Sequence, residues 1–419
     1  MRSRSGIIIA LLILAFLEYY CFVAVQVATR NLPGKIRYPV FLLYILLSIG
    51  TWICLIRFRS LHLQDWLPMV RTLLISFVMG FIVAKIIMAA FMLIDDFRRL
   101  ITWIARQIGT FLPQAPQQTP GLRDISRSTF IARAGILAGG LLLGGFFYGT
   151  RNKYNYKIKR IRLYPDNMPQ AFRGLKIVQI SDIHSGSFDD PAAVARGVDM
   201  VLRENPDLIL FTGDLVNNIA SEIVPYKNIF SRLKAPMGVY SVLGNHDYGD
   251  YVEWPSAEAK AANLETLKKH HAEMGWKLMM NEHVVFERNN EKMALIGVEN
   301  WSAKARFPKH GNLVRAYAGL ENQDIPLKLL MSHDPSHWDA QVRPDFPDIN
   351  VTFSGHTHGM QFGLRLPWMQ WSPVQYMYKE WAGLYRERQQ YLYVNVGYGF
   401  LGYPGRLGIN PEITVMELL

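Results

Sequence analysis

The chain has 419 residues, half of them hydrophobic, and its mean hydropathy is +0.06. Lysine and arginine outnumber aspartate and glutamate by 45 to 34, which gives a formal net charge of +11. This composition argues against a wholly soluble protein and favours a membrane region plus one sizeable further domain. No basic run is interleaved with aromatic residues, so we expect no nucleic-acid partner. The two cysteines, Cys21 and Cys54, lie in apolar segments, which excludes a disulfide framework or a thiolate metal site.

Four apolar segments predict membrane-spanning helices within residues 1–150. They lie near residues 6–28, 38–56, 67–94 and 131–149. The first three have about the 20 residues that a helix needs to cross a bilayer, and the fourth reaches that length only if residues 129–133 are included. We therefore expect a multi-pass protein of the cell (inner) membrane, with the lipid bilayer as a partner. The flanking basic residues divide evenly between the two sides, so charge does not indicate which side the rest of the chain faces.

Charged residues inside and after these segments carry further expectations. Glu18 and Lys85 lie within predicted spans, and because an unpaired charge in a bilayer is costly we expect them to pair inside a small helical bundle. Asp95 to Gln114 has apolar residues at helical spacing and is predicted to be an amphipathic helix at the membrane surface. The stretch from Pro113 to Pro120 is rich in proline and glutamine and is predicted to be a loop.

The pattern changes after Tyr148, and residues 153–419 predict a single α/β or α+β domain with mostly buried strands. Predicted strands cover 175–180, 208–212, 239–243, 293–298, 327–331, 351–353, 391–396 and 413–417. Predicted helices cover 191–204, 221–233 and 257–273.

Five of the predicted strands end in short polar motifs. These are Ser181-Asp182-Ile183-His184, Gly213-Asp214, Gly244-Asn245-His246-Asp247, Ser332-His333-Asp334 and Gly355-His356-Thr357-His358. Open α/β sheets place their functional sites at the carboxyl ends of strands, so these side chains are expected to converge. Carboxylate, imidazole and amide groups suit a pair of divalent ions such as Mn, Fe or Zn. Each motif alone is weak evidence, whereas five in this order are not expected by chance.

The order of the five motifs resembles the calcineurin-like metallophosphoesterase family. The resemblance covers residues 175–419 and every motif position is filled. Within the family the chain is most similar to the membrane-associated branch of YkuE-like phosphoesterases and UDP-diacylglucosamine pyrophosphohydrolases. The resemblance implies an α-helical membrane region followed by an αββα sandwich. One departure is Met360, where that branch commonly has glycine, and we expect it to alter the pocket wall.

The resemblance also implies a role for each motif residue. Asp182, His184 and His358 would hold one ion; Asn245, His333 and His356 would hold the second; Asp214 would bridge the two. His246 would face the phosphate and stabilise charge or protonate the leaving oxygen, with Asp247 orienting it.

The function implied is hydrolysis of a phosphate ester or pyrophosphate bond. Two ions lower the pKa of a shared water, and the resulting metal-bridging hydroxide attacks phosphorus in line. The membrane anchor favours a lipid-linked or envelope substrate over a soluble phosphorylated small molecule, although both remain open. The alternative is a catalytically weak membrane sensor or scaffold with a metal-binding domain, against which the complete ligand set argues. The sequence does not indicate the oligomeric state.

Two features near the C-terminus have open interpretations. Residues 366–385 contain six Trp and Tyr residues. They are expected either to pack in the core or to form an apolar lip that meets the membrane or a lipid tail. Arg406 is expected either to contact a phosphate or to form a surface salt bridge.

Overall fold

The computed structural model describes residues 4–57, 66–109, 127–366 and 368–419. The chain divides into two compact units, Met1–Tyr148 and Gly149–Leu419. The predicted loop at 113–120 lies outside the described residues. We describe the helical unit first and then the sheet-containing unit.

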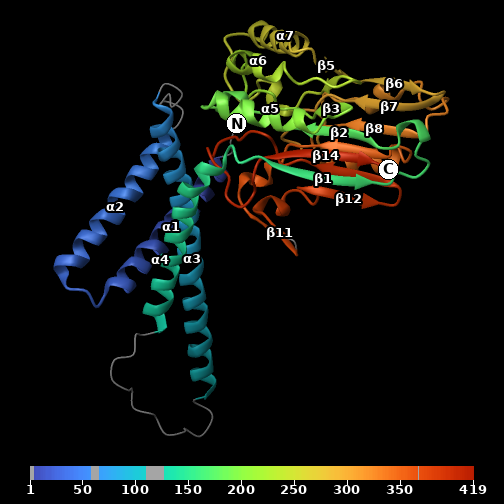
Figure 1. The fold of residues 1–419 in the computed structure, drawn as a ribbon. Helices are drawn as coiled ribbons and strands as arrows, with labels where there is room; N and C mark the ends of the chain where they lie inside the picture. Colours follow the sequence, from blue (N-terminus) through green and yellow to red (C-terminus); the bar gives the residue numbers. More distant parts are fainter. Residues whose placement is uncertain (1–3, 58–65, 110–126, 367) are drawn as a thin grey trace. The chain divides into compact units, whose positions relative to one another are not determined.

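The first unit consists of long apolar helices (Figure 1). They are α1 (Arg4–Thr29), α2 (Gly34–Arg57), α3 (Pro68–Gly109) and α4 (Arg127–Gly149). All four are long and apolar enough to cross a membrane. Helix α4 begins before the predicted segment and includes residues 129–133, which gives it the length that the shorter apolar run lacked.

Helix α3 differs from the prediction. A spanning segment near 67–94 and a separate surface helix from Asp95 were expected, but one unbroken helix of 42 residues covers both as far as Gly109. The chain contains no proline after Pro68 in this helix, and Asp95 forms ion pairs with Arg98 at 2.8 Å and Arg99 at 2.9 Å, one turn further on. At 1.5 Å per residue α3 is about 63 Å long, which is twice the thickness of a bilayer core.

The predicted pairing of Glu18 with Lys85 is confirmed. The Lys85 ammonium is buried and forms an ion pair with the Glu18 carboxylate. The same carboxylate accepts hydrogen bonds from the Trp52 indole and the Tyr44 hydroxyl, each at 2.8 Å. Helices α1, α2 and α3 are therefore joined by one polar cluster, in a region where apolar helix surfaces gain little from packing against each other rather than against lipid.

The second unit is built on two six-stranded sheets. The first has the order β1–β14–β2–β3–β4–β5 and the second the order β12–β13–β9–β8–β7–β6. The strands of the first are β1 (Lys157–Leu163), β14 (Glu412–Leu418), β2 (Leu175–Ile180), β3 (Leu208–Phe211), β4 (Val239–Ser241) and β5 (Lys277–Leu278). Those of the second are β12 (Gly383–Glu387), β13 (Gln390–Val394), β9 (Val351–Ser354), β8 (Leu327–Met331), β7 (Glu291–Gly297) and β6 (Glu282–Arg288). A separate hairpin pairs β10 (Leu364–Leu366) with β11 (Met369–Trp371).

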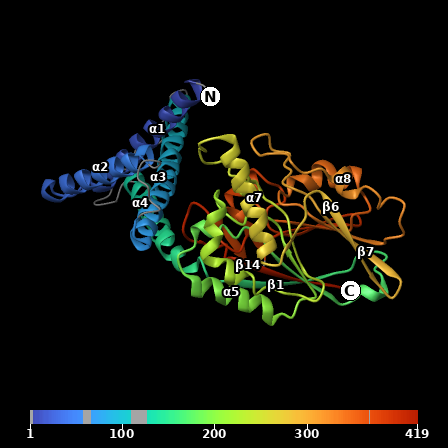
Figure 2. The same ribbon diagram turned by 90° about the horizontal axis from the view of Figure 1, so that it is seen from above.

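The two sheets pack face to face, and helices cover their outer faces. Ile177 of β2 and Leu329 of β8 belong to the same buried cluster between the sheets, whereas the next residues, Val178 and Leu330, point to opposite outer faces. Helices α5 (Pro191–Arg203), α6 (Lys227–Phe230) and α7 (Ala257–Glu273) cover the first sheet, and α8 (Leu313–Tyr317) lies beside β6 of the second (Figures 1 and 2). This is the expected αββα sandwich.

Parallel strands set the position of the functional site. In the first sheet β2, β3 and β4 are parallel neighbours, and in the second β8 and β9 are parallel neighbours. Their carboxyl ends therefore reach one edge in each sheet, and this is the geometry that the five motifs require. The predicted helix at 221–233 is instead a 3₁₀ segment, Ala220–Tyr226, followed by α6, because Pro225 cannot donate an α-helical hydrogen bond.

The polar cluster of the helical unit generates a stability prediction. Replacement of Lys85 by methionine should lower the free energy of unfolding by about 3 kcal/mol, because the Glu18 carboxylate then lacks its counter-charge. The double variant Glu18→Gln/Lys85→Met should recover much of this loss. Thermal unfolding of the full chain in detergent measures both, and a single variant as stable as the unmodified chain would contradict the prediction.

Candidate metal centre

The five motifs converge at one place in the sheet-containing unit. Asp182 and His184 follow β2, Asp214 follows β3, Asn245 follows β4, His333 follows β8, and His356 and His358 follow β9. These side chains are buried or nearly so, and they form two neighbouring groups that could each hold a metal ion. The two sheets thus bring residues from five motifs that are far apart in the sequence into a single cluster.

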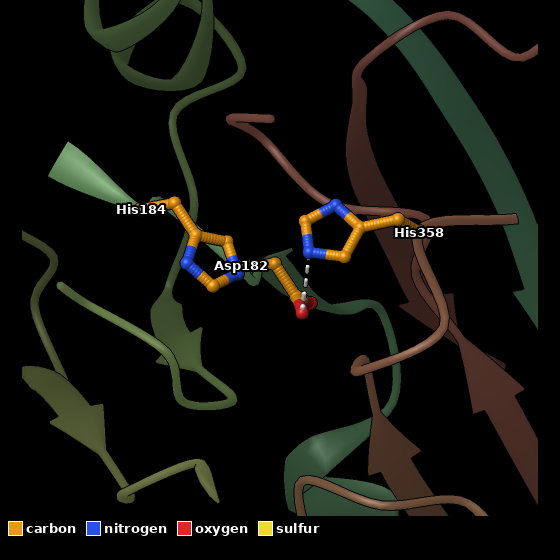
Figure 3. A group of neighbouring side chains, drawn as sticks. All are labelled: Asp182, His184 and His358. Atoms are coloured by element: carbon orange, nitrogen blue, oxygen red, sulfur yellow. Dashed lines mark ion pairs between the residues drawn. The ribbon is translucent and has the colours of Figure 1, made fainter. Parts of the chain in front are cut away.

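The first group contains Asp182, His184 and His358, whose ligand atoms all lie within 4.8 Å of one another. The carboxylate of Asp182 is 3.3 Å from Nε2 of His358, and the two imidazole rings have centroids 4.9 Å apart. Figure 3 shows the carboxylate and both rings directed toward the same space. Two ligands come from the first sheet and one from the second, so the group joins the two sheets.

The second group contains Asp214, His333 and His356. Oδ2 of Asp214 lies 3.2 Å from Nε2 of His333, and Nδ1 of His356 lies 2.8 Å from Oδ1 of Asn245. Asn245 therefore adds an amide oxygen beside this group.

Asp214 lies between the two groups. The same Oδ2 atom that contacts His333 is 3.5 Å from Nε2 of His184, which belongs to the first group. Its other oxygen, Oδ1, accepts a hydrogen bond from the backbone N–H of His246 at 2.9 Å. One carboxylate therefore faces ligands of both groups, in the position that a bridging ligand must occupy.

The backbone at the ligands adopts a conformation that side chains normally avoid. Positive φ values occur at Asp182 (51°), His184 (47°), Asp214 (61°), His356 (72°) and His358 (52°). Each left-handed residue costs on the order of 1 kcal/mol. Such strain is concentrated at functional sites, where the surrounding structure holds it. Here it turns successive side chains sharply at the strand ends and toward the cluster.

Two glycines allow the backbone to approach the ligands. A Cβ atom at Gly355 would collide with Asp182 and Ser181, and one at Gly244 would collide with Asp214. In both places the backbone of one motif lies against a ligand of another, and only glycine leaves room.

The buried imidazoles fit a metal site because several of their nitrogen atoms have no other partner. Among the described residues, Nε2 of His184, His333 and His358 lacks a hydrogen-bond partner, as does Nδ1 of His184. Burial lowers the pKa of His184 to about 3 and that of His356 to about 4, so these rings are neutral at pH 7. A neutral ring with a free, buried nitrogen is the form that coordinates a divalent ion.

His333 behaves differently because it faces a carboxylate. Burial alone would lower its pKa, but the negative charge of Asp214, whose Oδ2 lies 3.2 Å from Nε2, outweighs burial and raises the pKa of His333 to about 10. The buried Asp214 carboxylate therefore favours a positive charge beside it. A divalent ion bound between Asp214 and His333 would supply that charge.

The structure corrects the role expected for Asp247. Its carboxylate accepts hydrogen bonds from the backbone N–H groups of Gly244, Asp214, Leu215 and Val216, at 2.8–3.2 Å. The ring of His246 is oriented instead by the carbonyl oxygen of Asn217, which lies 2.7 Å from its Nδ1. Asp247 therefore holds the turn that carries Asp214, and not the ring of His246, because three backbone donors after β3 and one after β4 are directed at its carboxylate.

Neither expectation for Arg406 agrees with the structure. Its side chain is fully buried, so it is neither a surface salt bridge nor a phosphate contact. The guanidinium donates to the backbone carbonyls of Val396 at 2.8 Å and Gly397 at 3.2 Å, and it lies against His358. Arg406 thus supports the loop behind the first group.

A cavity of about 170 Å³ opens above the ligands. His184, Asp214, Asn245, His246, His356 and His358 form its polar floor. Its remaining wall is mainly apolar and includes Phe307, Met360, Val374, Met377 and Leu401, together with the cation Arg306. Met360 thus belongs to the pocket wall, as expected from the sequence, and it has a φ of 50°, a conformation that glycine adopts without strain.

Two residues near the second group were given no role by the sequence. The hydroxyl of Tyr378 lies 2.8 Å from Nε2 of His356 and donates to Asp334 at 3.1 Å. These contacts orient the ring of His356. Asp334 directly follows His333 and was visible in the sequence, whereas Tyr378 is brought to the site only by the chain path after β11.

Comparison with known proteins agrees with this geometry. Residues 175–360 match the family described as calcineurin-like phosphoesterase, and residues 2–153 match the family described as probable calcineurin-like phosphoesterase, transmembrane domain. A Danio rerio protein named transmembrane protein with metallophosphoesterase domain is 31% identical over 271 residues, covering 62% of this chain and 57% of the relative.

Two bacterial relatives match over more of their own length. The uncharacterized metallophosphoesterase YkuE of Bacillus subtilis is 28% identical over 311 residues, covering 71% of this chain and 99% of the relative. The UDP-2,3-diacylglucosamine pyrophosphatase LpxG of Chlamydia trachomatis is 28% identical over 302 residues, covering 60% of this chain and 87% of the relative. This chain thus spans nearly all of YkuE but little more than half of the zebrafish protein.

Two stacked mixed sheets with buried Asp and His at their strand ends, together with membrane-type helices, are the features of a membrane-associated protein with a metallophosphoesterase domain. Residues 175–360 form a domain of the calcineurin-like phosphoesterase family, and residues 2–153 match the transmembrane domain described for such proteins.

Metal content tests the ligand groups. Full-length protein purified with Mn²⁺ should carry about two ions per chain, and Asp214→Asn should lose both because that carboxylate faces both groups. His271→Asn is the matched control, since His271 is a buried imidazole outside the cluster, bonded to Ser241. Metal analysis by mass spectrometry measures the result, and full occupancy in the Asp214 variant would exclude the bridging position.

The position of Asp247 gives a separate prediction. Asp247→Asn places an NH₂ group against backbone N–H donors, so metal content should fall and unfolding should become easier by about 2 kcal/mol. Thermal unfolding and metal analysis test both effects. If the variant keeps its metal and its stability and loses only turnover, the role expected from the sequence, in which Asp247 orients His246, would be restored.

Proposed function

We propose that the chain is a membrane-anchored hydrolase that cleaves phosphate ester or pyrophosphate bonds with two divalent ions, on a lipid-linked substrate. The observation that supports this most strongly is the pair of ligand groups joined by Asp214, with buried imidazole nitrogens that lack other partners among the described residues. Mn, Fe or Zn suits this donor set.

Each ligand has a place in the proposal. Asp182, His184 and His358 would hold one ion, His333, His356 and Asn245 would hold the other, and Asp214 would serve both. When bound, the ions activate water as a nucleophile and neutralise charge on the phosphoryl oxygens. The buried carboxylates and Arg406 keep the ligands in place, and the cavity walls limit the water that reaches the reacting phosphorus.

His246 is the proton donor of the proposal. The carbonyl oxygen of Asn217 can only accept a hydrogen bond, so Nδ1 of His246 carries the proton between them. Nε2 is then the nitrogen that exchanges a proton with the substrate. Since His246 lines the cavity, its protonated ring can stabilise phosphoryl charge or protonate the leaving oxygen.

The shape of the cavity favours an amphiphilic substrate. Its ligands form a polar floor that suits a phosphate, and Phe307, Met360, Val374, Met377 and Leu401 give it an apolar wall. Two further observations agree with a lipid-linked substrate. The described residues include four membrane-type helices, and one relative is named for the pyrophosphate of a diacylated nucleotide sugar. We place the enzyme in the inner (cell) membrane.

Turnover by His246 variants tests the mechanism. His246→Ala should lower kcat by about 10²–10⁴-fold while both ions are retained, because this residue donates a proton and is not a ligand. The assay uses detergent-solubilised full-length protein with added Mn²⁺ and a chromogenic phosphodiester, followed by lipid-linked pyrophosphates and phosphomonoesters. Unchanged turnover in the variant would remove His246 from the chemistry.

The same panel decides between an enzyme and a sensor or scaffold. A scaffold would bind two ions and hydrolyse none of the substrates. Full metal occupancy of the unmodified chain together with no turnover on every class of substrate would therefore overturn the proposed function.

A further inference from the structure

The hairpin β10–β11 turns its apolar face away from the protein. Leu364 pairs with Trp371 and Leu366 with Met369, and side chains of paired residues share one face of a two-stranded sheet. The opposite face carries Arg365 and Gln370. Arg365 forms an ion pair of 2.5 Å with Glu412, whose side chain is only 1% exposed, so Arg365 is directed toward the core of the unit, whereas Gln370 is exposed at the edge of the hairpin. A hairpin at the surface of a soluble domain normally has the reverse arrangement.

The outward face of the hairpin is unusually exposed for its composition. Leu364 is 47% exposed, Leu366 39% and Met369 38%, and Trp368 in the connecting turn is 77% exposed. The hairpin is separate from the two large sheets and β11 projects from them (Figure 1). A two-stranded hairpin is marginally stable by itself, so a large apolar surface in water would weaken it further.

The apolar surface continues into the next segment. Trp371 Nε1 lies 3.5 Å from the hydroxyl of Tyr376, at the end of the 3₁₀ segment η10 (Pro373–Tyr376). Tyr376 is 78% exposed and Met377 is 41% exposed. Among the described residues of the sheet-containing unit, seven of the fourteen exposed large apolar side chains lie between residues 360 and 377. The patch is therefore concentrated and not a scatter of single residues.

This surface borders the metal cavity and is flanked by cations. Met360 and Met377 belong both to the patch and to the cavity wall. Arg306 lines the same cavity, and the ammonium of Lys304 lies 5.4 Å from the ring centre of Tyr378. Aromatic and apolar side chains beside exposed cations are the combination that binds the headgroup region of a bilayer with anionic lipids.

The chain connection limits how far the sheet-containing unit can move from the membrane. Helix α4 ends at Gly149 and β1 begins at Lys157, so residues 150–156 join a spanning helix to the first sheet. At about 3.5 Å per residue this segment reaches at most about 25 Å. A bilayer surface is therefore always available to this unit at high local concentration.

From these observations we propose that the outward face of β10–β11, with Trp368, Tyr376 and Met377, is a membrane-contact surface that docks the sheet-containing unit onto the lipid headgroup region. The docked surface places the rim of the metal cavity at the interface. The contact itself does not depend on the proposed function, whereas its consequence for lipid-linked substrates rests on it.

Depth-dependent quenching tests the contact in the full-length protein. Replacing Cys21 and Cys54 by alanine gives a cysteine-free background, into which Met369→Cys, Gln370→Cys or Val314→Cys is introduced separately. Met369 lies on the apolar face and Gln370 on the opposite face of the same strand, and Val314 is a 64% exposed apolar residue on α8. Each variant is labelled with a fluorophore and placed in nanodiscs that contain anionic lipid and doxyl-labelled lipid.

The proposal expects lipid quenching and a blue-shifted emission at position 369, weaker effects at 370 and none at 314. Equal behaviour at 369 and 314 would overturn it. Shielding at 369 without lipid quenching would also overturn it, because that result indicates a second copy of the chain as the occupant. Shielding that appears only with added lipid-linked substrate would assign the face to a substrate acyl chain and exclude the membrane contact.

A kinetic test separates this inference from the proposed function. The variant Trp368→Ser/Tyr376→Ser should hydrolyse a phosphodiester embedded in liposomes about tenfold more slowly than the unmodified chain, with unchanged turnover of a water-soluble chromogenic diester. An equal loss on both substrates would indicate a structural role for the hairpin and contradict the inference. If the unmodified chain hydrolyses neither substrate, the proposed function fails, and the quenching result still decides the membrane contact.

Discussion

Burial of polar ligands without hydrogen-bond partners is the constraint on which the catalytic unit depends. An unpaired buried polar group costs free energy, and here several imidazole nitrogens of this kind meet at one point. The fold holds them there with left-handed backbone at five ligand positions and with glycines where strands meet ligands. Asp247 and Arg406 complete this support by binding backbone groups on either side of the cluster. Burial of unpaired nitrogens and left-handed backbone each cost free energy, and together they produce a site whose donor set suits a cation.

The same reasoning connects the site to the membrane. The cavity has a polar floor and an apolar rim, and the rim is continuous with the outward face of the β10–β11 hairpin. That face is inverted, since Arg365 points inward to Glu412 while leucine, methionine and tryptophan point outward. The helical unit has a similar arrangement. Glu18 and Lys85 pair among the helices, and the outer helix surfaces are apolar. In the helical bundle and in this one hairpin, a charged pair lies on the inner side and apolar side chains on the outer side, which is the arrangement that lipid surroundings favour.

Sequence patterns predicted the interior of each sheet and missed its edges. The eight predicted strands correspond to β14, β2, β3, β4, β13, β9, β8 and β7, which are the interior strands of the two sheets. Within these two sheets the four strands that were not predicted, β1, β5, β6 and β12, are the edge strands, and the separate hairpin β10–β11 was also not predicted. Interior strands are buried on both faces and have continuous apolar runs, whereas β1 reads Lys-Ile-Lys-Arg-Ile-Arg-Leu and is largely exposed. An edge strand is specified mainly by the neighbour to which it bonds, and local hydrophobicity does not reveal that neighbour.

The order of polar motifs after apolar strands, the four helices long and apolar enough to span a membrane and the Glu18–Lys85 pair were determined by the sequence alone. These features depend on local composition and on the cost of burying charge, which can be read along the chain. The partners of Asp247, the burial of Arg406, the approach of Tyr378 to His356 and the outward face of β10–β11 were decided only by the tertiary structure. Each of these depends on which distant segments meet when the two sheets stack, and side-chain direction at such a meeting point is not encoded by spacing in the sequence.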